Sequence, residues 1–285
     1  MAGMGAIVAM VNQKGGVGKT SVTLGLASAA MADGRRVLVV DLDPQASSSW
    51  VLGDDPATSN PSVADVLTGG GTAAAVRAVQ PSSWGDGVDL LPASAQLGRW
   101  EHASSRDLTK LRKALLGVVD GYDAVLVDCA PSLGYLTTTG LAAADLAVIV
   151  VEPSALGLRG ISAVADAIDG VWEKANPDLD LAGVIVNKVP AVSSEAERRL
   201  DELVTVVGRR AIWKPMIPQR VVVGQAIAER RPIHSYGWRA TDLIQALTPS
   251  GPASAAARAR SVSARTSNSP VRVRRSGTRR SRVRT

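Results

Sequence analysis

A glycine-rich loop near the N-terminus constrains this chain more than any other feature. The loop reads NQKGGVGKTS over residues 12–21 and follows an apolar run, Ala6–Val11. A helix is predicted from Lys19 to about Met31. A loop of this kind, between a buried strand and a helix, turns consecutive N–H groups towards an anion, and the helix start adds partial positive charge. The sequence therefore predicts an α/β fold built around a phosphate-binding loop.

The loop departs from the plain phosphate-binding pattern in two ways. The pattern G-x-x-x-x-G-K-[ST] requires glycine five positions before Gly18, where this chain has Gln13. A second lysine, Lys14, stands where the pattern requires nothing. The remainder fits, because Lys19 is placed to reach the β- and γ-phosphates of a nucleotide and Thr20 to put its hydroxyl on Mg²⁺.

Apolar runs of strand length alternate with segments of helical period along the chain. This alternation predicts an α/β fold, a mostly parallel twisted sheet with helices on both faces. Together with the phosphate-binding loop it indicates a P-loop NTPase-like fold. Further strands are expected at Arg36–Asp41, Val88–Ser94, Tyr122–Asp128, Asp145–Pro153 and Leu181–Lys188, with a short one near Ile212–Ile217. Further helices are expected near Val63–Leu67 and Ala73–Val79, and at Arg106–Val118, Leu136–Ala144, Ile161–Lys174, Glu195–Val207 and Trp238–Leu247.

Carboxylates follow two of the predicted buried strands. The run VLVVDLDPQ ends in Asp41 and Asp43, and the run VLVDCAPS contains Asp128. Open α/β sheets bind ligands at the carboxyl ends of their strands, so these acids are expected to lie beside the loop. Nucleotide hydrolysis needs such groups for a metal ion and for water. Asp128 is the expected Mg²⁺-side (Walker B) acid.

Charge divides the chain into a body and a tail. The chain has 32 Lys and Arg against 26 Asp and Glu, yet ten of the arginines and no acid lie in residues 249–285. That segment has almost no large apolar residues, so we expect residues 1–248 to form the ATPase-like domain and 249–285 a disordered basic tail. The tail contains Arg272, Arg274 and Arg275 and suits phosphate contact without base readout.

Composition excludes several classes of protein. The one cysteine, Cys129, excludes a disulfide framework and a four-thiolate metal site within one chain. No apolar run approaches the length of a spanning helix, about 18 residues, and the N-terminus is not typical of a signal peptide. We therefore expect a cytoplasmic protein without membrane contact.

Three motifs together resemble a known family. NQKGGVGKTS, DLDPQ and DCAPSLG, in this order, are similar to those of the ParA/MinD group of deviant-Walker ATPases, and most similar to the ParA or Soj-like partition ATPases. The deviant loop K-G-G-x-x-K-[ST] is met from Lys14 to Thr20. The resemblance runs from about Ala6 to Leu247. It implies an ATP-dependent homodimer that binds double-stranded DNA non-specifically and associates with the nucleoid. It also implies slow intrinsic ATP hydrolysis that a ParB-like centromere-binding partner stimulates.

The resemblance also implies roles for single residues. Lys14 matches the signature lysine, which crosses to the phosphates of the other subunit, and Asp43 matches the residue that positions the attacking water. Asp41 matches a switch and Mg²⁺-shell acid, and Asn187 a residue that reads the edge of adenine. The implied ATP contacts are Lys14, Gly15, Gly16, Val17, Gly18, Lys19, Thr20, Ser21 and Asn187, with Lys14, Lys19 and Asp43 catalytic and Thr20, Asp41 and Asp128 on Mg²⁺.

The expected DNA contacts are less specific. Soj-like proteins commonly read I-P-R-N-V-R after the last strand, whereas this chain reads IPQRVV from Ile217 and loses both arginines in register. Neighbouring arginines are the alternative contacts, and each also fits a solvated surface charge. They are Arg198, Arg199, Arg220, Arg230 and Arg231, together with the tail.

Other functions remain open at this point. A MinD-like membrane ATPase would end in an amphipathic helix, and the valines of residues 249–285 form no apolar stripe. A nitrogenase-iron-protein-like reductase would need paired cysteines. A carboxylate–amine ligase, or a ParA-related ATPase that positions cargo other than DNA, is compatible with the same loop.

Overall fold

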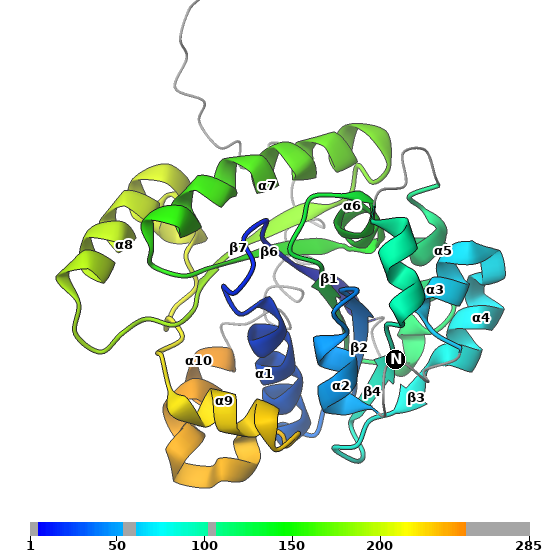
Figure 1. Cartoon of the computed structure of the whole chain (residues 1–285), viewed down its shortest axis with the longest axis horizontal. Helices are drawn as coiled ribbons and strands as arrows, with labels where there is room; N and C mark the ends of the chain where they lie inside the picture. The colour runs from blue at the N-terminus through cyan, green and yellow to red at the C-terminus, as the bar shows by residue number, and fades with distance from the viewer. Residues whose placement is uncertain (1–4, 54–60, 102–106, 249–285) are drawn as a thin grey trace, which may run out of the picture.

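The architecture is a single sheet covered by helices on both faces (Figure 1). The computed structural model describes residues 5–53, 61–101 and 107–248. Within these residues the strands are β1 (Ala6–Val11), β2 (Val37–Leu42), β3 (Gln80–Pro81), β4 (Val88–Leu91), β5 (Ala124–Cys129), β6 (Leu146–Val151) and β7 (Asp180–Val186). The predicted fold class is confirmed.

The helices differ more than the strands from their predicted bounds. They are α1 (Lys19–Ala32), α2 (Ser47–Leu52), α3 (Val63–Asp65), α4 (Gly71–Ala78), α5 (Lys110–Leu115), α6 (Tyr135–Ala143), α7 (Ala155–Lys174), α8 (Ser194–Val207), α9 (Val221–Ala228) and α10 (Thr241–Leu247). A 3-10 segment, Ile233–Ala240, replaces the first part of the predicted last helix. The predicted tail, residues 249–285, lies outside the described residues.

Strand order places the loop at the middle of the sheet. The order is β3-β4-β2-β5-β1-β6-β7, and every described pairing is parallel except β3 with β4. β1, which leads into the loop, therefore lies between β5 and β6. Asp41 of β2 and Asp128 of β5 are direct register partners. Because both residues lie near the carboxyl ends of neighbouring strands, the predicted carboxylates come together.

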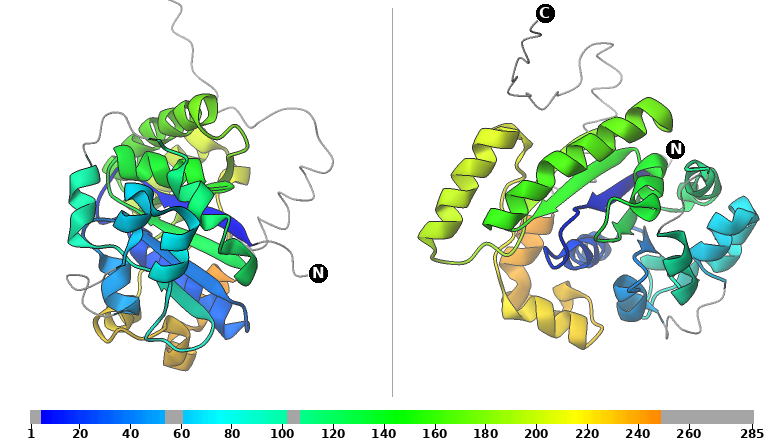
Figure 2. Two further views of the ribbon diagram at one scale, coloured as in Figure 1. Left: turned by 90° about the vertical axis from the view of Figure 1, so that its right-hand side faces the viewer. Right: turned by 45° about the horizontal axis from the view of Figure 1, so that its top comes forward.

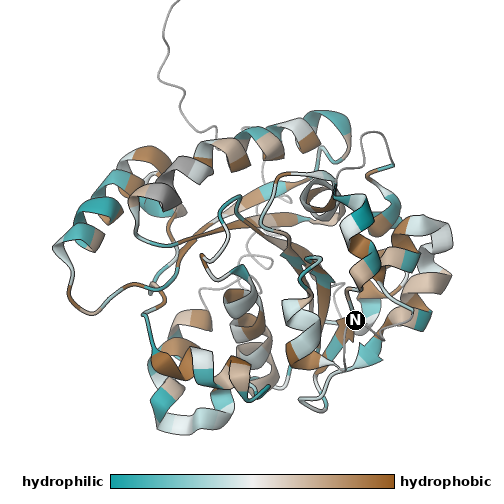
Figure 3. Ribbon diagram, in the orientation of Figure 1, coloured by the Kyte–Doolittle hydropathy of each residue, from teal (hydrophilic) through white to brown (hydrophobic). Residues whose placement is uncertain are grey.

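Both faces of the sheet are apolar because each face packs against helices. In β1, Ile7, Ala9 and Val11 join the cluster beneath α3 to α7, while Val8 and Met10 join the cluster beneath α1, α9 and α10. Figure 3 shows the strands as a hydrophobic centre, and the two views of Figure 2 show the helical layers on either side. This double coverage explains why the strands are near-continuous apolar runs.

The strand predicted near Ile212–Ile217 is wrong. The structure has a 3-10 turn at Arg209–Ala211 and two isolated bridges, Val184 with Ile212 and Val189 with Pro218. Pro215 and Pro218 lack the N–H that a ladder needs, so the pairing does not propagate. The segment still runs alongside β7 and fixes the chain that follows that strand.

Candidate nucleotide-binding site

The loop turns sharply where its glycines permit it. Gly16 and Gly18 have φ values of 80° and 89°, in the left-handed region that favours glycine. Gly18 is also the residue from which α1 begins, and its carbonyl accepts the first helical hydrogen bond, from the Val22 N–H at 2.9 Å. A Cβ at Gly18 would overlap the amide nitrogen of Asn187. Two of the three loop glycines are therefore required by backbone geometry.

The start of the loop is tied to the neighbouring strand by Asn12, a residue that sequence reasoning missed. Its side chain is fully buried, and its Nδ2 donates to the Val150 carbonyl of β6 at 2.6 Å. Its Oδ1 accepts the Lys14 N–H at 2.9 Å. Asn12 thus sets the direction in which Lys14 leaves the strand. The only sequence signal was a polar residue at the end of an apolar run.

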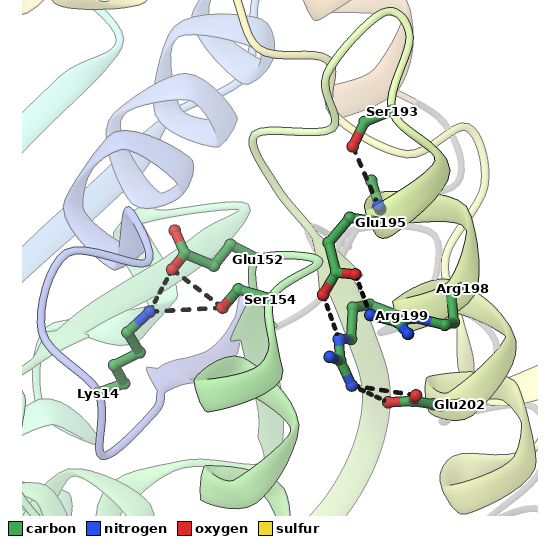
Figure 4. Close-up of polar contacts among 9 residues, drawn as sticks. Lys14, Glu152, Ser154, Ser193, Glu195, Arg198, Arg199 and Glu202 are labelled. Atoms are coloured by element: carbon green, nitrogen blue, oxygen red, sulfur yellow. Dashed lines mark hydrogen bonds and ion pairs between the residues drawn. The ribbon is translucent and has the colours of Figure 1, made fainter.

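Lys14 is held by its own chain. Its ammonium group forms an ion pair with Glu152 Oε1, just after β6, and lies 3.5 Å from Ser154 Oγ (Figure 4). The Ser154 hydroxyl also donates to Glu152 Oε1 at 3.2 Å. Burial alone would raise the pKa of Glu152, but the hydrogen bond and charge of Lys14 outweigh it and lower that pKa. Glu152 thus holds Lys14 through its carboxylate, and the described hydrogen bonds and ion pairs of the Lys14 ammonium group are with Glu152 and Ser154.

Lys19 has the opposite surroundings. Its side chain is buried within the described chain, with only 6% of the residue exposed. Burial lowers the pKa of Lys19, and the charges of Asp128 and Asp43 oppose that shift. A buried ammonium group facing carboxylates suits the binding of a nucleotide's phosphates with Mg²⁺, because the acids hold the metal and the lysine meets the anion.

The structure brings Asp41 and Asp128 together in a buried polar cluster that includes two serines. Asp41 is fully buried and accepts hydrogen bonds from the Asp43 N–H at 3.0 Å, the Ser49 N–H at 2.8 Å and the Ser49 hydroxyl at 2.7 Å. The Ser48 hydroxyl donates to Asp128 Oδ2 at 2.7 Å. Burial raises the pKa of both aspartates. Sequence reasoning missed Ser48 and Ser49, whose only signal was their position after DLDPQ.

Asp41 therefore has a second task. Both of its oxygens hold the segment that leads from β2 into α2, so its placement on Mg²⁺ stays a prediction. Asp43 lies at the same edge, 9% exposed, with Oδ1 accepting the Gln45 N–H at 2.9 Å. Burial also raises the pKa of Asp43. A half-enclosed carboxylate of this kind can orient a water molecule beside the loop.

The described residues fit a magnesium ion that is completed by substrate. Asp128 Oδ1 is buried and has no hydrogen-bond partner among the described residues, an orphaned acceptor that a cation would satisfy. Thr20, the second residue of α1, has a hydroxyl that lowers the pKa of Asp128 by hydrogen bonding. Across the described part of the chain, no group of three His, Cys, Asp or Glu side chains could hold a metal alone. This suits Mg²⁺, which takes few protein ligands and several phosphate oxygens.

Comparisons with known proteins agree with this geometry. A family model described as an AAA domain matches residues 5–181. The Sporulation initiation inhibitor protein Soj of Bacillus subtilis is 34% identical over 237 residues, covering 82% of this chain and 92% of the relative. The Chromosome partitioning protein ParA of Caulobacter vibrioides is 32% identical over 237 residues, covering 81% and 86%. This chain belongs to the Soj/ParA family of P-loop ATPases.

Two solved structures share this fold, and one of them contains bound nucleotide. Cobyrinic acid a,c-diamide synthase from Mycobacterium smegmatis, crystallised with ADP and magnesium, is 33% identical with a TM-score of 0.68, covering 80% of this chain and 91% of that one. The cell division ATPase MinD of Pyrococcus furiosus is 25% identical with a TM-score of 0.67, covering 86% and 97%. Nucleotide and Mg²⁺ binding are consistent with these neighbours.

The arginines expected to contact DNA are mostly engaged within this Soj/ParA-family chain. On α8, Arg198 pairs with Glu195, and Arg199 pairs with Glu195 and Glu202 (Figure 4). With Glu197 and Asp201 as well, α8 carries more acids than bases. These pairs weaken the expectation that α8 faces DNA, which stays a prediction.

The remaining arginines lie around α9. Arg220 pairs with Asp242 at 2.6 Å. The guanidinium of Arg230 lies over the Trp50 ring at 5.7 Å, and that of Arg231 over the Tyr236 ring at 5.3 Å. Arg272, Arg274 and Arg275 lie outside the described residues. Of these described arginines, Arg230 and Arg231 lie over aromatic rings, and Arg231 also pairs with Glu229 at 3.8 Å. Their contact with DNA stays a prediction.

One further finding bears on the membrane-binding alternative. In the part of the chain that the structure describes, no helix combines the length and apolar character needed to cross a membrane.

Proposed function

We propose that this protein is an ATP-dependent DNA partition ATPase. Two subunits would sandwich ATP, the dimer would bind double-stranded DNA without sequence preference, and hydrolysis stimulated by a ParB-like partner would release it. The observation that carries the proposal is Lys14, a second loop lysine that lies outside the buried centre around Lys19. A loop with Lys19 alone would serve hydrolysis within one chain. The relatives named for chromosome partitioning support the choice of cargo.

The proposed reaction is water attack on the γ-phosphate. The water oxygen bonds to the γ-phosphorus and the bond to the bridging oxygen of ADP breaks. Both protons of the water end on the released phosphate, as H₂PO₄⁻, and the bond's electron pair stays on ADP. Asp43 orients the water, while Lys19 and the Lys14 of the second subunit neutralise developing charge. Mg²⁺, held through Thr20 and Asp128, supplies charge neutralisation at the phosphate oxygens. Intrinsic turnover is expected to be slow, because the stimulating partner completes the site.

DNA binding is proposed to combine the arginines near α9 with the basic tail. The contact is electrostatic and should weaken as salt rises. With about six tail arginines on phosphates, the slope of log K against log salt should be roughly −5. A variant that ends at Thr248 should show a smaller slope. An unchanged slope would remove the tail from the DNA contact.

Nucleotide-dependent DNA binding tests the function as a whole. The intact protein is titrated onto duplex DNA with ATP, with ADP and without nucleotide, and the measurement is repeated on the variant that ends at Thr248. We expect binding with ATP to be the strongest in both proteins. Equal binding in all three conditions by the shortened variant would contradict a nucleotide switch.

Two alternatives are separated by cheap assays. The M. smegmatis neighbour is named as a cobyrinic acid a,c-diamide synthase, which favours a test for amide formation. ATP turnover that requires cobyrinic acid and an amide donor, and is indifferent to DNA, would support that activity. A ParA-related ATPase that positions other cargo would show DNA binding but no stimulation by a centromere-binding partner.

A further inference from the structure

Two consecutive residues after β7 hold two consecutive carbonyls of the phosphate loop. Asn187 Nδ2 donates to the Val17 carbonyl at 2.9 Å. Lys188 Nζ donates to the Gly16 carbonyl at 2.6 Å. These contacts join segments that are 170 and 172 residues apart in sequence. The loop follows β1, whereas Asn187 and Lys188 follow β7. The tertiary fold therefore brings these two side chains to the loop carbonyls.

The planar trans peptide bond fixes the direction of the loop N–H groups once the loop carbonyls are held. The C=O and N–H of one peptide unit point in opposite directions. Holding the Gly16 carbonyl therefore turns the Val17 N–H away from Lys188, and holding the Val17 carbonyl turns the Gly18 N–H away from Asn187. Neither N–H donates to any residue that the structure describes. Two adjacent donors are thus fixed in direction and have no backbone partner among the described residues, although Val17 as a whole is buried.

The two holding residues are themselves fixed on both sides. The Asn187 N–H donates to the Val151 carbonyl of β6 at 2.8 Å, and the Val189 N–H donates to the Ile217 carbonyl at 3.0 Å. Asn187 is only 5% exposed. Between these anchors, Lys188 adopts a φ of 56°, a left-handed conformation that is uncommon for a residue with a side chain. Such a conformation persists where the surrounding structure enforces it.

We propose that Asn187 and Lys188 are positioning residues for phosphate binding, because they aim the Val17 and Gly18 N–H groups at the phosphates of the nucleotide. The inference rests on the proposed binding of ATP and gives Asn187 a task other than reading adenine. It also explains why Gly18 admits no side chain, since a Cβ there would overlap the Asn187 amide and separate it from the loop. Preorganised N–H donors of this kind lose no free energy to reorientation when the anion arrives.

The test compares ATP with inorganic tripolyphosphate, which has phosphates but no base. Dissociation constants are measured by calorimetry with Mg²⁺ for the full chain and for Asn187→Ala and Lys188→Ala. We expect Asn187→Ala to weaken both ligands by the same factor, about tenfold for one lost hydrogen bond at a buried site. Lys188→Ala should weaken both by less, because Lys188 is exposed. Lys188→Arg, which keeps a charged donor, should restore part of the loss.

Different results would contradict the positioning role of Asn187 and Lys188 and the proposed binding of ATP. Loss of ATP affinity in Asn187→Ala with unchanged tripolyphosphate affinity would overturn the inference and favour adenine reading. Unchanged affinity for both ligands, with a lower melting temperature, would show a purely structural role and would also overturn it. Failure of the unaltered protein to bind ATP would instead defeat the proposed function. Lys214→Ala removes another exposed lysine, one that forms no hydrogen bond with the described loop residues, and should leave both affinities unchanged.

Discussion

The two lysines of the loop differ in what holds them. Lys19 is almost fully buried and faces Asp43 and Asp128 of its own chain. Lys14 is partly exposed, with 30% of its side chain accessible, and pairs with Glu152 through an ion pair that water can reach. A buried cation among carboxylates is costly to move, whereas a partly exposed ion pair is worth about 1 kcal/mol or less. The Lys19 side chain is therefore expected to keep its position, whereas Lys14 can leave Glu152 for another partner at little cost in free energy.

Removing Lys19 should have the largest effect. Lys19→Ala takes away the charge that meets the phosphates and leaves Asp128 with one fewer counter-charge. We expect ATP affinity to fall by at least about 100-fold, together with turnover and nucleotide-dependent DNA binding. Calorimetry with ATP and Mg²⁺ checks this. If Lys14→Ala lost as much ATP affinity as Lys19→Ala, the contrast between the two lysines would be wrong.

Asp43→Ala should slow ATP hydrolysis without preventing ATP-dependent dimer formation. The carboxylate is proposed to orient water, and among the described residues it forms no hydrogen bond or ion pair with Lys14 or Glu152. Turnover should fall by about 100-fold or more, while ATP binding and ATP-dependent dimers persist. Phosphate release and light scattering measure the two properties on one sample. Loss of the dimer along with turnover would mean that Asp43 also shapes the subunit interface.

Lys14→Ala should remove the dimer and spare the monomer's nucleotide site. Because Lys14 pairs with Glu152, in an ion pair that is partly exposed, ATP affinity of the monomer should change by less than about threefold, the size of a surface contact. The ATP-dependent dimer, measured by sedimentation equilibrium, should be lost. A persistent dimer would show that Lys14 does not reach the second subunit.

Glu152→Gln should strengthen the dimer, which is the smallest of these effects. Lys14 would no longer have to leave a carboxylate, and each dimer contains two such pairs. At about 0.5–1 kcal/mol per pair, dimerisation should tighten by roughly five- to thirtyfold. Sedimentation equilibrium with ATP in an Asp43→Ala background avoids hydrolysis during the measurement. Ser154→Ala is the matched control, since it removes the hydroxyl contacts to Lys14 at 3.5 Å and to Glu152 at 3.2 Å but leaves the ion pair in place. A weaker dimer in Glu152→Gln would show that Glu152 supports the interface.

Much of the site followed from sequence because it depends on strand ends. Asp41, Asp43 and Asp128 each end an apolar run, and parallel pairing brings the ends of neighbouring strands to one level. The loop was recognisable because a left-handed turn requires glycine at particular positions, here Gly16 and Gly18.

The remaining residues could not be predicted for a common reason. Asn12, Glu152 and Lys188 act through single side-chain contacts between segments brought together by the fold, and no periodicity encodes such contacts. Helix α9 was missed because its first residues, VVV, favour strand by propensity. Its burial against α1 and the 3-10 segment overrides that preference.

The position of β1 between β5 and β6 has a consequence for how the protein could change over time. The groups facing Lys19 stand on β2 and β5, and the groups that hold Lys14 and the loop carbonyls follow β6 and β7. Substitutions on one flank of the sheet can therefore alter the rate of ATP cleavage without altering when subunits meet. A substitution of Glu152 on the other flank can instead change how readily Lys14 leaves its own subunit, and thus the lifetime of the assembly, while the groups around Lys19 stay unchanged. A fold with its loop strand at a sheet edge would have no such independence.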